Sequence, residues 1–274
     1  MIQPATAPTD SGFIDGRVPY YRTGDGPQTL LFVPGLSEAF DRHPNWRLAQ
    51  MLGRTYDGLT DDYTVWTVPR PDGMDPGTTT RDMAGTYATV LDELGGGHVV
   101  GYSMGGFVAQ HLAADYPELV DRLVVGAAAD RLGEGGVSIV EAWRELAENG
   151  EWSRLYGSTT RHSYVGWRKS VYAPVARAFG AVSAPPVPSD VVVSCDACLE
   201  HDASDVLGDI DVPTLVVGGS EDRLFPESRL RATKEAVPGA KLALLRGAGH
   251  AAMDEHRGQF VDVVRRFLRD EPLR

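Results

Sequence analysis

The sequence predicts an α/β fold, a mostly parallel sheet flanked by helices, with a mainly helical segment inserted between two of the strands. Short apolar runs of strand character alternate with segments whose apolar residues recur at helical spacing, which is typical of a parallel sheet covered on both faces. Residues 130–208 interrupt this alternation and are far longer than a usual connection. A chain of 274 residues, 42% of them hydrophobic, can bury the core of such a domain.

The elements follow one another in a regular order. Residues 12–22 predict an antiparallel hairpin turned at Asp15-Gly16. Strands are then expected at 29–33, 63–68, 98–102, 123–125, 214–217 and 241–245. Helices are expected between them at 45–55, 80–94, from Ser103 to Pro117, at 227–236 and at 259–268.

The interval 130–208 predicts a helical cap, so that residues 1–129 and 209–274 together form the core. Ligands of open α/β sheets bind at the carboxyl ends of the strands, which the cap would cover. Cys195 and Cys198 have only His201 nearby, too few ligands for a structural zinc, and are interpreted as two cysteines one turn apart on a helix. The aromatic residues of the interval form either the cap's own core or a pocket wall: Trp143, Trp152, Tyr156, Tyr164, Trp167, Tyr172 and Phe179.

Composition limits the partners. The net charge is −12 and no basic run occurs, which disfavours nucleic acid and anionic lipid as partners. No apolar run approaches the ~20 residues that span a bilayer. The first residues lack the basic and apolar regions of a secretion signal, so a cytoplasmic protein is expected. A small-molecule substrate is expected, without metal or cofactor, and a homodimer is left open.

The most informative stretch is Gly101-Tyr102-Ser103-Met104-Gly105, which joins a predicted strand to a predicted helix. A serine at the tip of such a turn is exposed at the end of the sheet, and the flanking glycines avoid clashes that side chains would create. This geometry makes Ser103 a candidate nucleophile. The pentapeptide alone is equally compatible with a glycine-rich turn, so its partners must decide.

A serine nucleophile needs a base that is itself oriented by an acid. His250 lies in Gly247-Ala248-Gly249-His250, directly after the last predicted strand, and is the expected base. Asp222 follows the preceding strand, after the paired glycines Gly218-Gly219, and is the expected acid. The three residues occur along the chain in the order serine, aspartate, histidine, which is the order expected when the serine lies on this type of strand-to-helix turn. Asp130, which also follows a strand, and Glu221, next to Asp222, remain alternatives.

An oxyanion hole requires two backbone N–H groups aimed at the developing negative charge. Met104, directly after the nucleophile, is expected to supply one of them. Leu36, in the loop Pro34-Gly35-Leu36-Ser37 after the strand at 29–33, is expected to supply the other.

With these residues in place, the chain from about Gly12 to Leu268 resembles the α/β-hydrolase superfamily. Three segments carry the resemblance: the Ser103 turn extended to Gly106, Gly218-Gly219-Ser220-Glu221-Asp222, and the loop that ends at His250. The resemblance implies the α/β-hydrolase fold with a cap domain inserted after the sixth strand. Members often have His-Gly in the oxyanion loop, where this chain has Pro34-Gly35.

These residues predict a serine hydrolase that cleaves an ester-type bond of a small, uncharged or apolar substrate through an acyl-enzyme on Ser103. Relatives that attack with aspartate, the haloalkane dehalogenases and epoxide hydrolases, are disfavoured because the turn carries serine. A lactonase, a carbon–carbon bond hydrolase and a perhydrolase share the same triad and remain alternatives. A non-catalytic ligand receptor of this fold is a further alternative of a different class.

Overall fold

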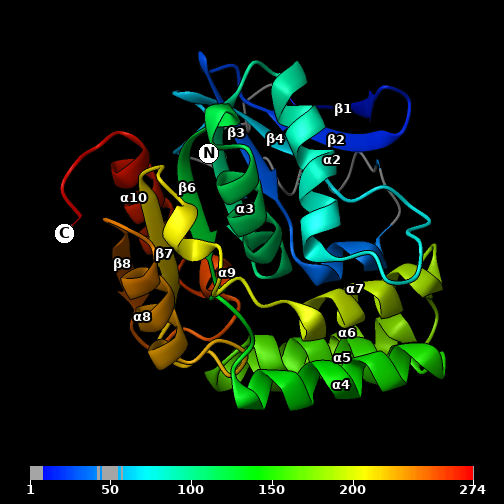
Figure 1. Ribbon diagram of the computed structural model, residues 1–274. Coiled ribbons are helices and arrows are strands. Elements are labelled where there is room, and N and C mark those ends of the chain that lie inside the picture. The colour runs from blue at the N-terminus through cyan, green and yellow to red at the C-terminus, as the bar shows by residue number, and fades with distance from the viewer. Residues whose placement is uncertain (1–8, 42–43, 45–54, 57, 274) are drawn as a thin grey trace, which may run out of the picture.

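The computed structural model of the chain describes residues 9–41, 44, 55–56 and 58–273. Within these residues eight strands form one sheet, in the order β1-β2-β4-β3-β5-β6-β7-β8 (Figure 1). The strands are β1 (Thr9–Ile14), β2 (Val18–Thr23), β3 (Gln28–Val33), β4 (Tyr63–Thr67), β5 (Gly97–Tyr102), β6 (Val120–Gly126), β7 (Thr214–Gly219) and β8 (Lys241–Leu245). The hairpin β1-β2 and its pairing with β4 are antiparallel, and every pairing from β4 to β8 is parallel. The predicted fold class is confirmed.

Helices cover both faces of the sheet because its parallel strands are apolar on both sides. On β3, Leu31 and Val33 pack with α2 (Thr80–Glu93) and α3 (Met104–Asp115), while Leu30 and Phe32 face the opposite side and pack with the cluster that includes α10 (Arg257–Leu268). Apolar residues that alternate in this way along a strand divide the core into two layers. The helix α8 (Glu227–Ala236) lies on the same side as α2 and α3, through Leu230.

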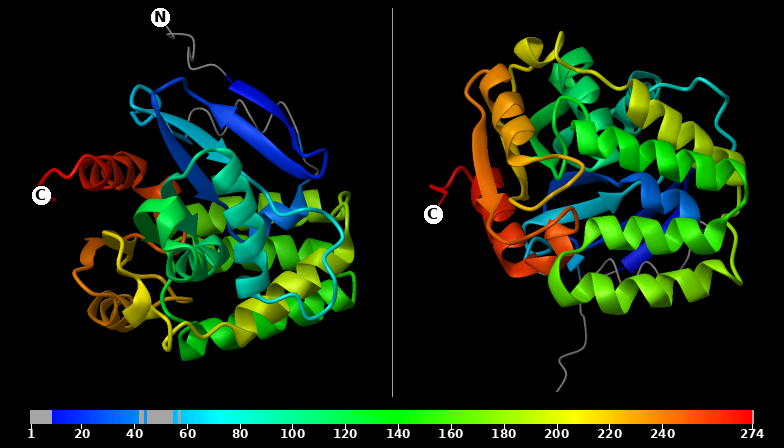
Figure 2. Two further views of the ribbon diagram at one scale, coloured as in Figure 1. Left: turned by 45° about the horizontal axis from the view of Figure 1, so that its top comes forward. Right: turned by 90° about the horizontal axis from the view of Figure 1, so that it is seen from below.

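Four helices follow β6 and precede β7: α4 (Glu134–Glu148), α5 (Trp152–Ser163), α6 (Gly166–Gly180) and α7 (Pro188–Glu200). We call them the helical insertion. They form a layer of their own at one end of the sheet (Figures 1 and 2). They lie beyond the carboxyl ends of the parallel strands, where ligands of open α/β sheets bind.

One sequence-based expectation about the connections is untested, and one differs from the structure. The helix expected at 45–55 lies almost wholly outside the described residues. A short helix, α9 (Ala252–Glu255), precedes α10, and the two are separated at His256, which has non-helical backbone angles. Within the described residues no helix has the length and apolar character needed to cross a membrane.

Candidate active site

Ser103 lies on a sharp turn between β5 and α3. Its backbone angles, φ 55° and ψ −123°, are unusual for a residue with a side chain, and such a conformation costs on the order of 1–3 kcal/mol. The turn is held by the Ser103 N–H, which donates to the Gly126 carbonyl at 2.8 Å. The strained turn places the serine side chain beyond the end of the sheet.

The glycine at position 105 is required by a close approach of two main chains. A Cβ atom at Gly105 would lie 1.9 Å from the carbonyl oxygen of Val33. No side chain fits in that space, so the first turn of α3 packs directly on the end of β3. This contact brings the loop after β3 next to Ser103: a Cβ atom on Gly35 would lie 3.1 Å from the Ser103 Cβ.

Ser103, His250 and Asp222 form a hydrogen-bonded chain. The distance between Ser103 Oγ and His250 Nε2 is 2.9 Å, and His250 Nδ1 lies 2.8 Å from Asp222 Oδ2. Asp222 is buried, and its Oδ1 accepts hydrogen bonds from the N–H groups of Leu224 and Phe225 at 2.8 and 3.1 Å. With a proton on Nδ1 donated to Asp222, Nε2 is free to accept the proton of Ser103.

The two alternative acids lie elsewhere. Asp130 is engaged by Arg229 in an ion pair and by the Thr233 hydroxyl at 3.3 Å. Glu221 is exposed, whereas the neighbouring Asp222 is buried. The structure therefore brings only Asp222 of these three carboxylates to His250.

Hydrogen bonds with Tyr102, Ser163 and Glu255 help to hold the loop that carries His250. The Tyr102 hydroxyl donates to the His250 carbonyl at 2.6 Å. The Ala251 N–H donates to the carbonyl of Ser163, at the end of α5, at 2.8 Å. The carboxylate of Glu255 accepts the N–H of Gly249 at 2.7 Å and the N–H of Val165 at 2.8 Å.

These contacts connect the loop of the base, His250, to two other parts of the molecule. Through Tyr102 the loop is attached to the turn between β5 and α3 that carries Ser103, which we call the elbow, and through Glu255 and Ser163 it is attached to the helical insertion. The sequence pattern did not indicate Tyr102 or Glu255, because a hydrogen bond between a side chain and a distant main chain leaves no signal in sequence spacing.

A buried ion pair supports the loop after β3. The Arg70 guanidinium lies 2.6 Å from the Glu38 carboxylate, with both side chains almost fully buried, and also donates to the Gly35 carbonyl at 3.4 Å. Leu36, the expected oxyanion donor, begins the 3-10 helix Leu36–Phe40 and is buried. Met104, the other expected donor, is the first residue of α3 and is also buried. Both residues lie beside Ser103.

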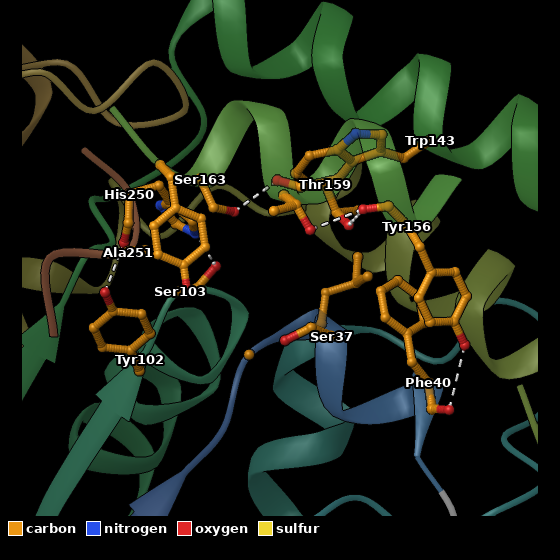
Figure 3. Close-up of a pocket in the computed structure, with 14 residues that line it drawn as sticks. Ser37, Phe40, Tyr102, Ser103, Trp143, Tyr156, Thr159, Ser163, His250 and Ala251 are labelled. Atoms are coloured by element: carbon orange, nitrogen blue, oxygen red, sulfur yellow. Dashed lines mark hydrogen bonds between the residues drawn. The ribbon is translucent and has the colours of Figure 1, made fainter. Parts of the chain in front are cut away.

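A cavity of about 320 Å³ opens above Ser103. Figure 3 shows Ser103 and His250 at one end of this cavity, and Phe40 with Tyr156 at the other. The Phe40 and Tyr156 rings stack with their centroids 4.6 Å apart. Burial raises the pKa of Tyr156 to about 12, so its hydroxyl stays neutral. No Lys, Arg, Asp or Glu is among the described residues that line the cavity.

The sequence left two roles open for the aromatic residues of the helical insertion, a core of their own or a pocket wall, and some of these residues take neither role. Trp143, Tyr156 and Tyr164 line the cavity. Trp167 and Phe179 are exposed on the outer surface of α6. The insertion also supplies hydroxyl groups to the cavity wall, from Thr159, Thr160 and Ser163.

Comparison with known proteins identifies the family. The sequence profile of the alpha/beta hydrolase family matches residues 30–263. The chain belongs to the alpha/beta hydrolase family.

The proteins similar to this alpha/beta hydrolase are named after different activities. A pyrrolizixenacetamide deacetylase of Xenorhabdus hominickii is 29% identical, over 94% of this chain and 97% of its own. A 2-hydroxy-6-oxononadienedioate/2-hydroxy-6-oxononatrienedioate hydrolase of a Pseudomonas species is 26% identical, over 94% of this chain and 93% of its own. Among solved structures, the enol-lactonase from Burkholderia xenovorans LB400 has a TM-score of 0.77 at 19% identity, covering 94% of this chain and 99% of its own. These likenesses support a hydrolase without fixing the bond that it cleaves.

Cys195, Cys198 and His201 lie close together in the sequence, at the C-terminal end of α7. Cys195 and Cys198 are free and buried in α7, one helical turn apart. The His201 ring stacks on Phe107, and its Nδ1 lies 2.8 Å from the Thr80 hydroxyl. Among the described residues, no group of three or more His, Cys, Asp or Glu side chains is arranged to hold a metal ion.

Proposed function

We propose that this protein is a serine hydrolase that cleaves an ester-type bond of a small, uncharged substrate through an acyl-enzyme on Ser103. The observation that carries the proposal is the unbroken chain from Ser103 Oγ through His250 to Asp222, with links of 2.9 and 2.8 Å, at the end of a cavity. Hydrogen bonds of this length allow the base to remove the serine proton as the bond to carbon forms.

In the acylation step, Ser103 Oγ attacks the carbonyl carbon and its proton moves to His250 Nε2. The carbonyl electrons move onto the oxygen, which the N–H groups of Leu36 and Met104 stabilise. Asp222 holds the imidazole in the required tautomer and stabilises its positive charge. The bond to the leaving alcohol then breaks, and His250 returns the proton to that alcohol.

In the deacylation step, water takes the place of the alcohol. His250 removes a proton from the water as its oxygen attacks the acyl carbon. The bond to Ser103 Oγ breaks, and His250 protonates the serine. The free acid leaves, and the three side chains are restored without a metal or cofactor in any step.

The cavity wall supports an uncharged substrate. Its described lining combines aromatic rings with neutral hydroxyl groups and carries no Lys or Arg side chain that could pair with a carboxylate. Burying an unpaired charge is strongly unfavourable. The dicarboxylates in the name of the Pseudomonas relative therefore fit this wall less well than a neutral ester or lactone.

Turnover of p-nitrophenyl esters of graded chain length tests the proposal. Ser103→Ala is expected to abolish both turnover and labelling by a fluorophosphonate, because the Ser103 hydroxyl is the group that His250 Nε2 contacts, at 2.9 Å. Full activity of Ser103→Ala would overturn the proposal. The exposed residue Ser204, changed to alanine in the same way, is a matched control that should leave both unchanged.

The alternatives predict different results in the same assays. A lactonase would hydrolyse lactones faster than open-chain esters of the same size. A carbon–carbon hydrolase or a receptor would leave both classes intact while Ser103 still reacts with the fluorophosphonate. A perhydrolase would form peracid from an ester when hydrogen peroxide is present.

A further inference from the structure

One side of the active-site cavity is formed by a face of α5. Tyr156, Thr159, Thr160 and Ser163 all line the cavity, and their spacing along the chain places them on one face of the helix. Figure 3 shows Ser163, Thr159 and Tyr156 in this order from the end of the cavity that holds the nucleophile to the opposite end. We call this surface the α5 wall.

The hydroxyl protons of the α5 wall are used within the helix itself. The Thr160 hydroxyl donates to the Tyr156 carbonyl at 2.9 Å, and the Thr159 hydroxyl donates to the same carbonyl at 3.0 Å. The Ser163 hydroxyl donates to the Thr159 carbonyl at 2.8 Å. Side chains of serine and threonine form such bonds to a carbonyl three or four residues earlier in a helix. Since a hydroxyl has one proton and two lone pairs, each of these oxygens keeps its capacity to accept and has no proton left to donate.

The donors of two aromatic residues of the cavity wall are engaged in the same manner. Trp143 Nε1 donates to the Ser158 hydroxyl at 3.1 Å, and the Tyr156 hydroxyl donates to the Phe40 carbonyl at 3.4 Å. These residues therefore present ring surfaces and lone pairs to the cavity. A ligand forms hydrogen bonds with the α5 wall by donating to it.

The donor that fits the α5 wall is uncharged. A carboxylate would place negative charge against the lone pairs of the hydroxyl oxygens. An ammonium group could donate to them, but no Asp or Glu is among the described residues that line the cavity, and burying an unpaired charge is strongly unfavourable. A hydroxyl or an amide N–H donates a hydrogen bond without carrying charge.

The distance between the donor and the reacting carbonyl follows from the geometry of the helix. The Ser163 carbonyl accepts the N–H of Ala251, which places this end of α5 beside His250. With a rise of about 1.5 Å per residue, Thr159 and Thr160 lie about 4.5–6 Å further along the helix. Three bonds of an extended chain span about 3.3–3.6 Å, so this distance corresponds to about five bonds.

We propose that the α5 wall selects substrates that carry a neutral hydrogen-bond donor, a hydroxyl or an amide N–H, about five bonds from the carbonyl carbon that Ser103 attacks. The inference rests on the proposed function for the reacting carbonyl. The hydroxyl oxygens of Thr159, Thr160 and Ser163 determine the preference. Because these side chains are half-buried and keep their bonds to the helix, a substrate without the donor leaves no group fully unpaired, and we expect a preference of about threefold to tenfold.

Binding of two amides tests this preference without turnover. N-hexylacetamide has an N–H group, and N-methyl-N-hexylacetamide lacks it. Titration of the full chain, followed by NMR of the ligand, is expected to give a Kd about threefold to tenfold lower for the N–H amide. The combined variant Thr159→Val, Thr160→Val, Ser163→Ala removes the acceptor oxygens and should bring the ratio of the two Kd values to about one. Thr89→Val is the matched control: this hydroxyl donates to the Gly85 carbonyl at 3.2 Å on α2, outside the cavity, and its loss should leave the ratio unchanged.

Two pairs of esters extend the test to the reaction. p-Nitrophenyl 5-acetamidopentanoate carries its N–H on the acyl side and 3-acetamidopropyl acetate carries it on the alcohol side, and each is compared with its N-methyl analogue. We expect kcat/KM to be about threefold to tenfold higher for the N–H ester in the pair whose amide-bearing chain occupies the cavity. A preference in neither pair, with the esters hydrolysed, would overturn the proposal.

Three results of the amide titration would also overturn it. These are equal Kd values for the two amides in the wild type, an unchanged ratio in the combined variant, and tighter binding of hexylammonium than of N-hexylacetamide. If no ester is hydrolysed, the proposed function fails, whereas the amide titration still decides the donor preference. Melting temperatures equal to that of the wild type show that each variant is folded.

Discussion

Replacing Glu255 by glutamine tests whether the attachment of the histidine loop to the helical insertion positions the base. The buried carboxylate of Glu255 accepts two main-chain N–H groups, from Gly249 at 2.7 Å and from Val165 at 2.8 Å. A glutamine side chain has the same shape but only one acceptor oxygen. Its NH₂ group would face the second N–H, so one of the two bonds is lost.

The size of the effect follows from the number and kind of bonds. A hydrogen bond to a charged group contributes about 1.5–3 kcal/mol, and the N–H left without an acceptor adds to the loss. We expect Glu255→Gln to lower the free energy of unfolding by about 2–3 kcal/mol, which for a chain of 274 residues corresponds to a fall of about 4–5 °C in Tm. Because His250 is next to Gly249, we also expect kcat to fall about tenfold to hundredfold, with a much smaller change in KM.

Calorimetry and steady-state hydrolysis of a p-nitrophenyl ester measure the two effects separately. The exposed Glu221, changed to glutamine in the same way, is the control and should melt and turn over like the wild type. If Glu255→Gln matches this control in both assays, the reasoning about the two hydrogen bonds is wrong. If Tm falls while kcat stays unchanged, Glu255 stabilises the fold without positioning the base.

Three further predictions concern the elbow, the acid and a buried histidine. Asp222→Asn should lower kcat about 10³- to 10⁴-fold with little change in KM, because the amide favours the wrong tautomer of His250; ester kinetics measure this. Gly105→Ala should prevent soluble folding, since its Cβ would lie 1.9 Å from the Val33 carbonyl oxygen; soluble yield and circular dichroism measure this. Burial lowers the pKa of His201 to about 3, below the value of about 6.5 in the unfolded chain, so stability is lost as the pH falls below 6.5. Urea unfolding at pH 7 and pH 5 should show that the wild type loses about 2 kcal/mol more than His201→Phe.

The order of the elements and the positions of Ser103 and His250 are predictable because each follows a strand. Parallel strands end at the same edge of a sheet, so residues directly after β5 and β8 must meet there. The same argument admits both Asp130 and Asp222, which follow β6 and β7. Only the three-dimensional structure separates them, because Arg229 lies on a helix that sequence spacing cannot place beside Asp130.

The supporting contacts of the site are not predictable from spacing. Glu255 accepts the N–H of Val165, which is 90 residues away in the sequence, and Arg70 donates to the Gly35 carbonyl across 35 residues. Such contacts depend on how the helical insertion and the loops pack. In the sequence, Glu255 is one of many charged residues near a predicted catalytic loop, and nothing there marks it as buried.

The hydroxyl of Tyr102 gives a structural role to a position of the pentapeptide Gly101–Gly105 that the sequence pattern leaves variable. The pattern of glycines and serine leaves the residue before the nucleophile free, yet here this residue donates to the His250 carbonyl and accepts the N–H of Met253 at 3.2 Å. The nucleophile and the support of its base are thus encoded by adjacent residues. To transfer this elbow to another protein, the tyrosine must be transferred together with the loop whose main chain it contacts. Substitutions at position 102 are expected to change the position of His250, the base, and to leave the position of the Ser103 side chain unchanged.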